Sequence, residues 1–122
     1  MSNALRLPLI VGGIYALIFG AIQMIPPLAE RVFGRPITDP AIESIWGATI
    51  LGLSLFYFIA ASDASKYRSF AWAFIFTLVL IVLNSCFYWF RGAYSASTIL
   101  PLITLNIVLA LWLFIAYRRS EV

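Results

Sequence analysis

The segment from Thr38 to Ala61 constrains the fold of this chain more than any other part of the sequence. It opens on a Pro-containing turn, carries one acidic residue, Glu43, and continues as an unbroken run of apolar and small side chains. A helix of this length crosses the roughly 30 Å hydrocarbon core of a bilayer. The segment therefore predicts a membrane-spanning helix with Asp39 as its N-cap and Pro40 at its first position.

Three further apolar runs accompany this segment. Hydrophobic residues make up 63% of the 122 residues and charged residues 11%, whereas about a quarter of a soluble domain is charged. A small water-soluble fold buries only about two thirds of its chain's surface, so it could not hide this much apolar area. We predict an all-α integral membrane protein, one domain over residues 1–122. It would be a four-helix transmembrane bundle of antiparallel up-down topology, with helices at about 7–25, 40–61, 67–91 and 98–117.

The first run, Leu7 to Ile25, could be a signal peptide or a retained helix. It is longer than a typical signal-peptide core, and no A-x-A cleavage site follows it, so we expect a retained helix. The connection that follows carries apolar residues between charged ones. It predicts a short interfacial helix over Leu28–Phe33 that ends at Gly34.

The basic residues indicate the orientation of the helices. The net charge is +3 and the isoelectric point about 9.4, but the basic residues flank the apolar runs, so we expect no nucleic-acid partner. Four spans place both termini on one side. That side holds five of the eight basic residues: Arg6, Lys66, Arg68, Arg118 and Arg119. The positive-inside rule then predicts a multi-pass protein of the cell (inner or plasma) membrane with both termini cytoplasmic.

Two stripes of small residues, each recurring every fourth position, predict a close helix–helix contact. The alternative is that glycine is simply common in membrane helices. The packing residues we predict are Gly12, Ala16 and Gly20 in the first run, and Ser44, Ala48 and Gly52 in the second.

The absence of certain residue types excludes several kinds of metal, haem and redox chemistry. The chain has no histidine and a single cysteine, Cys86, which excludes His-ligated metals, bis-His haem, C-x-x-C pairs and an internal disulfide. No paired carboxylates lie within a span. We therefore expect neither metal nor cofactor, and we expect that the protein is not an enzyme.

Polar residues concentrate toward one membrane boundary, which we take as the outer one. Two hypotheses explain them. They form interhelical hydrogen bonds, worth about 0.6 kcal/mol each, or they line a polar pocket that opens outward, with a Glu43–Arg91 ion pair near its mouth. The candidate ligand-binding residues are Gln23, Glu43, Asn84, Tyr88, Arg91 and Asn106.

The pocket hypothesis predicts a non-catalytic membrane protein. It would be an accessory subunit, or a binder of a small apolar or amphipathic molecule through the outer polar and aromatic residues. The alternative is a small-molecule transporter that uses Glu43 at the outer rim, although small multidrug exporters depend on a carboxylate deep in the first helix and this chain has none there. The partners expected are membrane lipids and either a second copy of the chain or a larger membrane complex.

Two sequence segments carry a family resemblance. The segment I-W-G-A-T-I-L-G-L after a polar Pro-containing loop, and an aromatic third run ending in F-Y-W-F-R-G, resemble the small four-helix bacterial membrane proteins of the BphX-like and DoxX-like kind. The resemblance implies a four-helix fold and a membrane location. No functional residues can be inferred from this resemblance.

Overall fold

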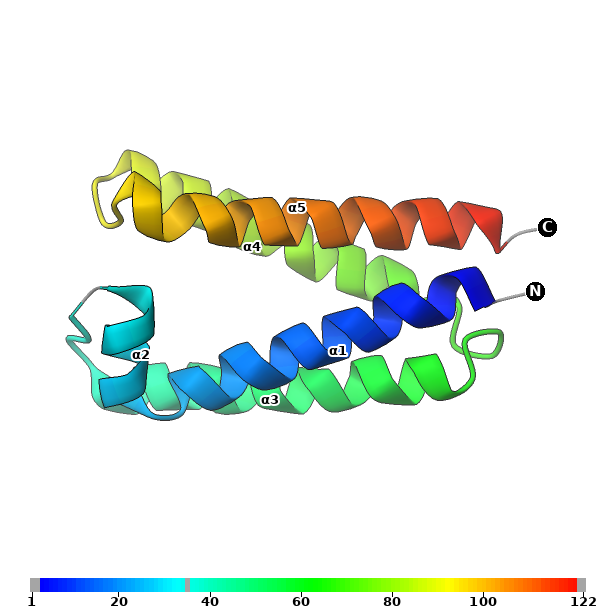
Figure 1. Ribbon diagram of the computed structural model, residues 1–122, viewed down its shortest axis with the longest axis horizontal. Coiled ribbons are helices and arrows are strands. Elements are labelled where there is room, and N and C mark those ends of the chain that lie inside the picture. The colour runs from blue at the N-terminus through cyan, green and yellow to red at the C-terminus, as the bar shows by residue number, and fades with distance from the viewer. Residues whose placement is uncertain (1–2, 35, 121–122) are drawn as a thin grey trace. The chain divides into compact units, whose positions relative to one another are not determined.

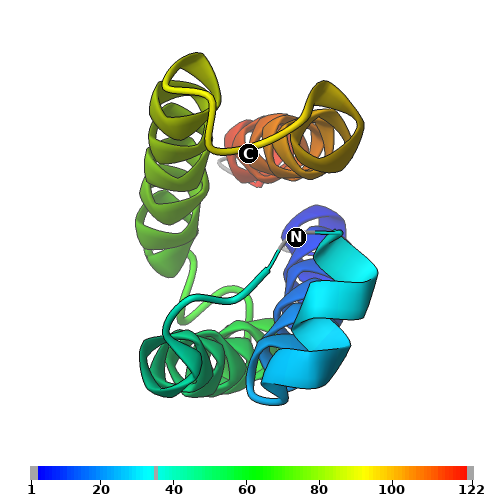
Figure 2. The ribbon, with the colours of Figure 1, turned by 90° about the vertical axis from the view of Figure 1, so that its left-hand side faces the viewer.

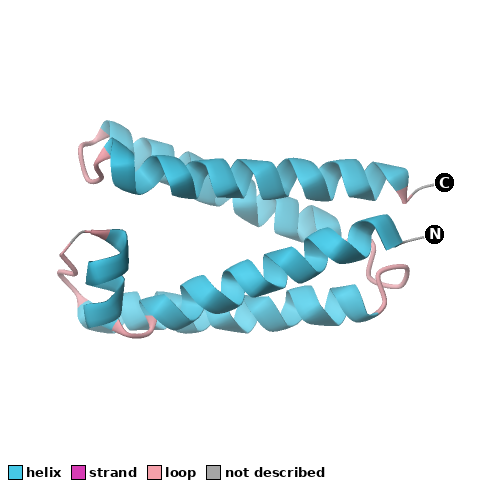
Figure 3. Ribbon diagram, in the orientation of Figure 1, coloured by secondary structure: helices cyan, strands magenta, loops and turns pink. Residues whose placement is uncertain are grey.

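The computed structural model describes residues 3–34 and 36–120, and it is helical throughout (Figures 1 and 3). Between the helices of this described part lie only loops and turns. In chain order its helices are α1 (Asn3–Gln23), α2 (Pro26–Phe33), α3 (Pro40–Ser62), α4 (Phe70–Phe90) and α5 (Ala96–Arg119).

Four of these helices, α1, α3, α4 and α5, are long and apolar enough to cross a membrane. They correspond to the four predicted runs, so the helical class and the number of long helices are confirmed. The largest boundary difference is at α1, which begins at Asn3 rather than at residue 7, and α4 begins at Phe70 rather than at residue 67. The late start of α4 has a local cause, because the residues before Phe70 form hydrogen-bonded turns. The Tyr67 N–H donates to the Asp63 carbonyl at 3.0 Å, and the Phe70 N–H donates to the Tyr67 carbonyl at 2.9 Å.

Close contacts divide the chain into two units. One, here called the α1–α3 unit, comprises Ile10–Ile59 and contains most of α1, all of α2 and most of α3. The other, here called the α4–α5 unit, comprises Met1–Leu9 together with Ala60–Val122. Each unit is described by itself below.

In the α1–α3 unit, the two long helices lie side by side and run in opposite directions (Figures 1 and 2). The short helix α2 is held to α1 by its last residue, because the rings of Phe19 and Phe33 stack with centroids 5.9 Å apart. Gly34 ends α2 in the left-handed conformation, at φ 68°, and its N–H donates to the Glu30 carbonyl. The predicted short helix and its stop residue are therefore present.

In the α4–α5 unit, the two helices also run in opposite directions. The ring of Trp72, near the start of α4, lies 5.2 Å from that of Tyr117 and 6.0 Å from that of Phe114, near the end of α5. Both helices place an apolar stripe in the core. The buried residues of these two helices are Ala71, Phe74, Leu78 and Ser85, with Ile99, Ile103, Asn106, Leu109, Ala110, Leu113 and Ala116.

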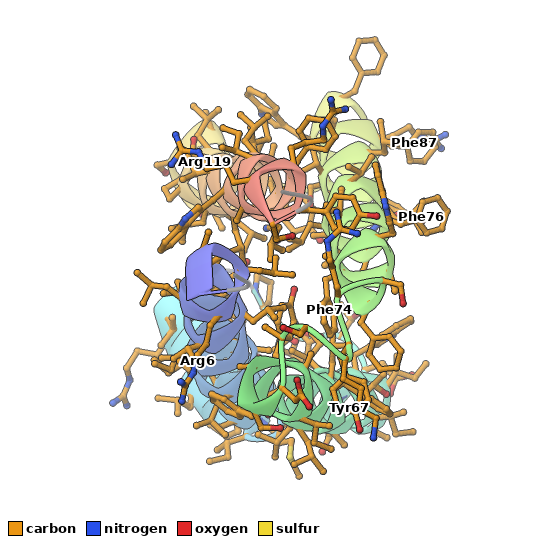
Figure 4. All side chains as sticks on the ribbon, turned by 90° about the vertical axis from the view of Figure 1, so that its right-hand side faces the viewer. Arg6, Tyr67, Phe74, Phe76, Phe87 and Arg119 are labelled. Atoms are coloured by element: carbon orange, nitrogen blue, oxygen red, sulfur yellow. The ribbon has the colours of Figure 1, made fainter. Side chains whose placement is uncertain are left out.

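Most of the apolar surface of α4 points outward. Only 22% of its span is buried, and Figure 4 shows Phe76 and Phe87 projecting to the side away from α5. Large contiguous patches of exposed apolar side chains are uncommon on soluble monomers. A surface of this kind suits lipid or another membrane protein.

Candidate functional site

The helix contact in the α1–α3 unit is made by glycine backbones. A Cβ atom on Gly20 would lie 2.5 Å from Leu51 N and 2.9 Å from the carbonyl oxygen of Gly47. A Cβ atom on Gly47 would lie 2.5 Å from Met24 N. Since real Cβ atoms do not come this close to other atoms, only glycine allows this spacing of the two helices.

The contact face of α3 differs from the prediction. Gly12, Ala16 and Gly20 of α1 are all buried, as a packing face requires, but Ala48 and Gly52 of α3 are exposed. A Cβ atom on Gly52 would meet nothing within 4 Å. The physical reason is the rotation of α3 about its axis: Gly47 is turned by about 100° from Ala48, and it is Gly47 that faces α1.

The residues of α3 that contact α1 are three or four positions apart in the sequence. Gly47 and Leu51 pack on Gly20, and the Ser44 hydroxyl donates to the Met24 carbonyl at 3.3 Å. Further along the contact, Tyr57 is 2% exposed and its ring lies against Gly12. Gly47 and Tyr57 were not among the predicted packing residues, and the i, i+3, i+7 spacing of Ser44, Gly47 and Leu51 was the signal that could have indicated Gly47.

Asn106 is the most buried polar side chain of α5. Its exposed fraction is 0%. The amide Nδ2 donates to the Leu102 carbonyl of the same helix at 2.7 Å, and the oxygen Oδ1 is buried with no hydrogen-bond partner among the described residues. Equal steps along both helices from the Trp72–Tyr117 contact place Asn106 level with Leu83, which Asn84 and Ser85 follow in α4.

Gln23 shows a similar feature in the other unit. It ends α1, its side chain is half-buried, and its oxygen Oε1 is buried without a partner among the described residues. Nearby in sequence, Glu43 is half-buried in the first turn of α3. The predicted N-cap is present, because Asp39 Oδ1 accepts a hydrogen bond from Ile42 N at 3.1 Å.

The remaining candidates lie near the end of α4 and are exposed: Asn84, Tyr88 and Arg91. The ring of Phe87 contacts two of these residues, Tyr88 and Arg91. Its ring is edge-on to Tyr88, with centroids 5.2 Å apart, and the guanidinium carbon of Arg91 lies 5.5 Å from it. The six candidates thus divide, with Gln23 and Glu43 in one unit and the other four in the second. A common pocket and a Glu43–Arg91 ion pair stay predictions.

Arg68 does more than contribute a charge that orients the helices, which was its only predicted role. Its Nε donates to the Ser120 hydroxyl at 2.8 Å, and its Nη2 donates to the Tyr117 carbonyl at 3.1 Å. The guanidinium carbon also lies 3.8 Å from the centre of the Tyr117 ring. Arg68 therefore holds the turn that precedes α4 against the C-terminal end of α5.

Metal-binding groups do not gather within the described residues. No set of three His, Cys, Asp or Glu side chains there could hold an ion. Cys86 is exposed on α4.

No family model, no curated protein and no solved structure matches this chain. The resemblance to BphX-like and DoxX-like proteins accordingly stays a prediction.

Proposed function

We propose that this chain is a multi-pass protein of the cell membrane, with four spans in antiparallel order and both termini in the cytoplasm. Two observations support this. Four helices are long and apolar enough to cross a bilayer. In addition, the end of the α4–α5 unit that carries Arg6, Lys66, Arg68, Arg118 and Arg119 holds most of the basic residues, as the cytoplasmic side of membrane proteins does.

Within that membrane, the chain acts as a non-catalytic binder of a small amphipathic molecule. The observation that carries this proposal is the buried Oδ1 of Asn106, which accepts no hydrogen bond within the described part of the chain. Leaving such an acceptor unpaired in an apolar environment costs about 1–3 kcal/mol. A ligand that donated a hydrogen bond to Oδ1 would remove that cost.

The chemistry around Asn106 defines the ligand class. Its neighbours on the buried stripe of α5 are Ile103, Leu109 and Ala110, which offer only apolar contact. A matching ligand has one hydroxyl or N–H donor on an apolar body, as a long-chain alcohol does. Because Asn106 is 0% exposed, a donor that reaches Oδ1 has to enter between the helices, which a small molecule can do and an accessory subunit cannot.

Photolabelling tests this function with a defined probe. The purified full chain in lipid nanodiscs is irradiated with a long-chain alcohol carrying a diazirine, and the labelled peptides are identified by mass spectrometry. We expect labelling of α5 near Asn106 that excess unlabelled alcohol suppresses. The matched diazirine alkane, which has no hydrogen-bond donor, should label the helices without saturation.

Two variants complete the test. Asn106→Leu should abolish the saturable labelling, while Thr104→Val, which removes an exposed polar group of the same helix, should retain it. If the alcohol and the alkane label equally, or if Asn106→Leu leaves saturable labelling intact, Asn106 does not anchor a ligand and the proposal fails.

The transporter alternative depends on Glu43. This residue lies in the first turn of α3, where the positive end of the helix dipole favours a carboxylate, rather than midway along the helix. A proton-driven flux in proteoliposomes that Glu43→Gln abolishes would favour transport over binding alone.

A further inference from the structure

The interior of the α4–α5 unit contains a second buried polar side chain, Ser85 of α4. It is 7% exposed, and Asn106 of α5 is 0% exposed. All the other buried residues of these two helices are apolar. Asn84, directly before Ser85, is exposed, so its amide lies off the buried stripe. Two polar groups, one on each helix, therefore interrupt an otherwise apolar core.

The register of the two helices brings Ser85 and Asn106 to nearly the same level. The helices pack along each other in opposite directions (Figure 1), and the closer ring contact between them joins Trp72 to Tyr117 at 5.2 Å. Eleven steps along each helix from this contact lead to Leu83 and to Asn106. Ser85 follows Leu83 by two residues, which is an axial distance of about 3 Å.

The directions of the two side chains reduce this offset. A helical side chain leans toward the N-terminus of its own helix. In an antiparallel pair, Asn106 therefore leans toward the level of Ser85, and Ser85 leans back toward the level of Asn106. The Asn106 amide shows this direction, because its Nδ2 donates to the carbonyl of Leu102, one turn nearer the start of α5. Its Oδ1 has no partner among the described residues, so a group that bonds to both side chains has to lie between them.

We propose that Ser85 is the second polar contact of the ligand and makes the site selective for a hydroxyl group, a role that rests on the proposed function at Asn106. A hydroxyl oxygen donates one hydrogen bond, to Asn106 Oδ1, and accepts another, from the Ser85 hydroxyl. The N–H of a pyrrole ring donates to Oδ1 but has no lone pair for Ser85. Ser85 therefore narrows the ligand class from any apolar molecule with one donor to an alcohol.

The test compares two competitors at the labelled site. The full chain in lipid nanodiscs is photolabelled with a trace of the diazirine alcohol, in the presence of tetradecanol or of a pyrrole with a decyl chain on a ring carbon. The lipid mole fraction of each competitor that halves the labelling near Asn106 is measured. Ser85→Ala should raise this mole fraction about fivefold for tetradecanol, the effect of one lost hydrogen bond, and leave that of the pyrrole unchanged. Comparing each competitor with itself cancels the difference in shape between the two molecules.

Thr77→Val is the matched control, because it also removes a hydroxyl from α4. The Thr77 hydroxyl donates to the carbonyl of Ala73 in its own helix at 2.8 Å, so we expect both mole fractions to stay as in the parent. Ser85→Ala should also melt within about 2 °C of the parent in micelles without ligand, since it exchanges one small helical residue for another. A markedly lower Tm would show that the Ser85 hydroxyl stabilises helix packing instead, and would overturn its role as a ligand contact.

The possible outcomes separate this role from the proposed function. If the parent shows no saturable labelling, or if Asn106→Leu retains it, the proposed function fails and the role of Ser85 fails with it. If the labelling depends on Asn106 but tetradecanol competes equally well in Ser85→Ala and the parent, the ligand is held by Asn106 alone and only the role of Ser85 is wrong. Equal weakening of both competitors in Ser85→Ala, or the same loss in Thr77→Val, would overturn that role as well.

Discussion

Gly20 of α1 and Leu51 of α3 meet backbone to backbone, with the Cβ position of Gly20 2.5 Å from the nitrogen of Leu51. No side chain separates the two helices at this point. In a membrane, where lipid is as apolar as the helices, such close packing supplies much of the energy of helix association.

Gly20→Ala and Gly47→Ala should therefore each destabilise the protein by about 1–3 kcal/mol, because the added methyl forces the helices apart. Gly52→Ala is the control: open space surrounds it, and alanine favours a helix by up to about 1 kcal/mol over glycine. Unfolding in mixed micelles with increasing SDS measures the free energies. A loss at Gly52 as large as that at Gly20 would show that the predicted stripe is in contact after all.

Gly12 should depend on Tyr57 in a measurable way. A methyl at Gly12 would overlap the Tyr57 ring, which is 2% exposed and has little room to move. Gly12→Ala should cost about 1–3 kcal/mol in the parent but much less in a Tyr57→Leu background. A double-mutant cycle from SDS unfolding gives the coupling energy, expected at about 0.5–3 kcal/mol, and independence of the two sites would contradict the contact.

Arg68→Lys should destabilise the protein by about 1–2 kcal/mol, since lysine cannot make both hydrogen bonds while stacking on Tyr117. Arg119→Lys, one residue before Ser120, is the matched control and should have little effect. Thermal unfolding in micelles, followed by far-UV circular dichroism, checks both. Equal Tm values for the two variants would mean that the Arg68 contacts contribute nothing measurable.

Asp39→Ala should cost about 1 kcal/mol through loss of the α3 N-cap. Asp39→Asn keeps an oxygen for the Ile42 N–H and should retain most of the stability. The comparison by SDS unfolding separates the cap from the negative charge. If Asp39→Asn is as unstable as Asp39→Ala, the charge rather than the hydrogen bond stabilises this end.

Asn106→Leu should leave the ligand-free protein equally stable or more stable, because it removes a buried acceptor that lacks a partner among the described residues. The same substitution should abolish saturable labelling by the diazirine alcohol. Tm in micelles without ligand provides the stability measurement. A marked loss of stability would instead mean that Asn106 contributes to folding, as interhelical hydrogen bonds do.

Rules that involve only a few neighbouring residues explain which structural features could be predicted from the sequence. Four long apolar helices, the stop at Gly34 and the cap at Asp39 each follow from a few neighbouring residues: length against bilayer thickness, glycine at positive φ, and a carboxylate before proline. Even the α1 face of the contact, with Gly12, Ala16 and Gly20 all buried, was visible in the sequence.

The sequence did not show which face of each helix packs against another helix. Gly47 and Gly52 are both glycines of α3, yet one packs on α1 and the other is open. Asn84 and Asn106 are both amides within spans, yet one is exposed and the other fully buried. Both members of each pair are the same type of residue, so residue type alone does not distinguish them.

By itself, then, the sequence determined an all-helical chain with four long apolar helices, because apolar length and helix signals act within each segment. Only the tertiary structure decided that Gly47 rather than Ala48 meets α1, that no described residue pairs with the buried oxygen of Asn106, and that Arg68 holds the end of α5. Those outcomes depend on how each helix is rotated about its axis, which is fixed by contacts between residues far apart in the chain.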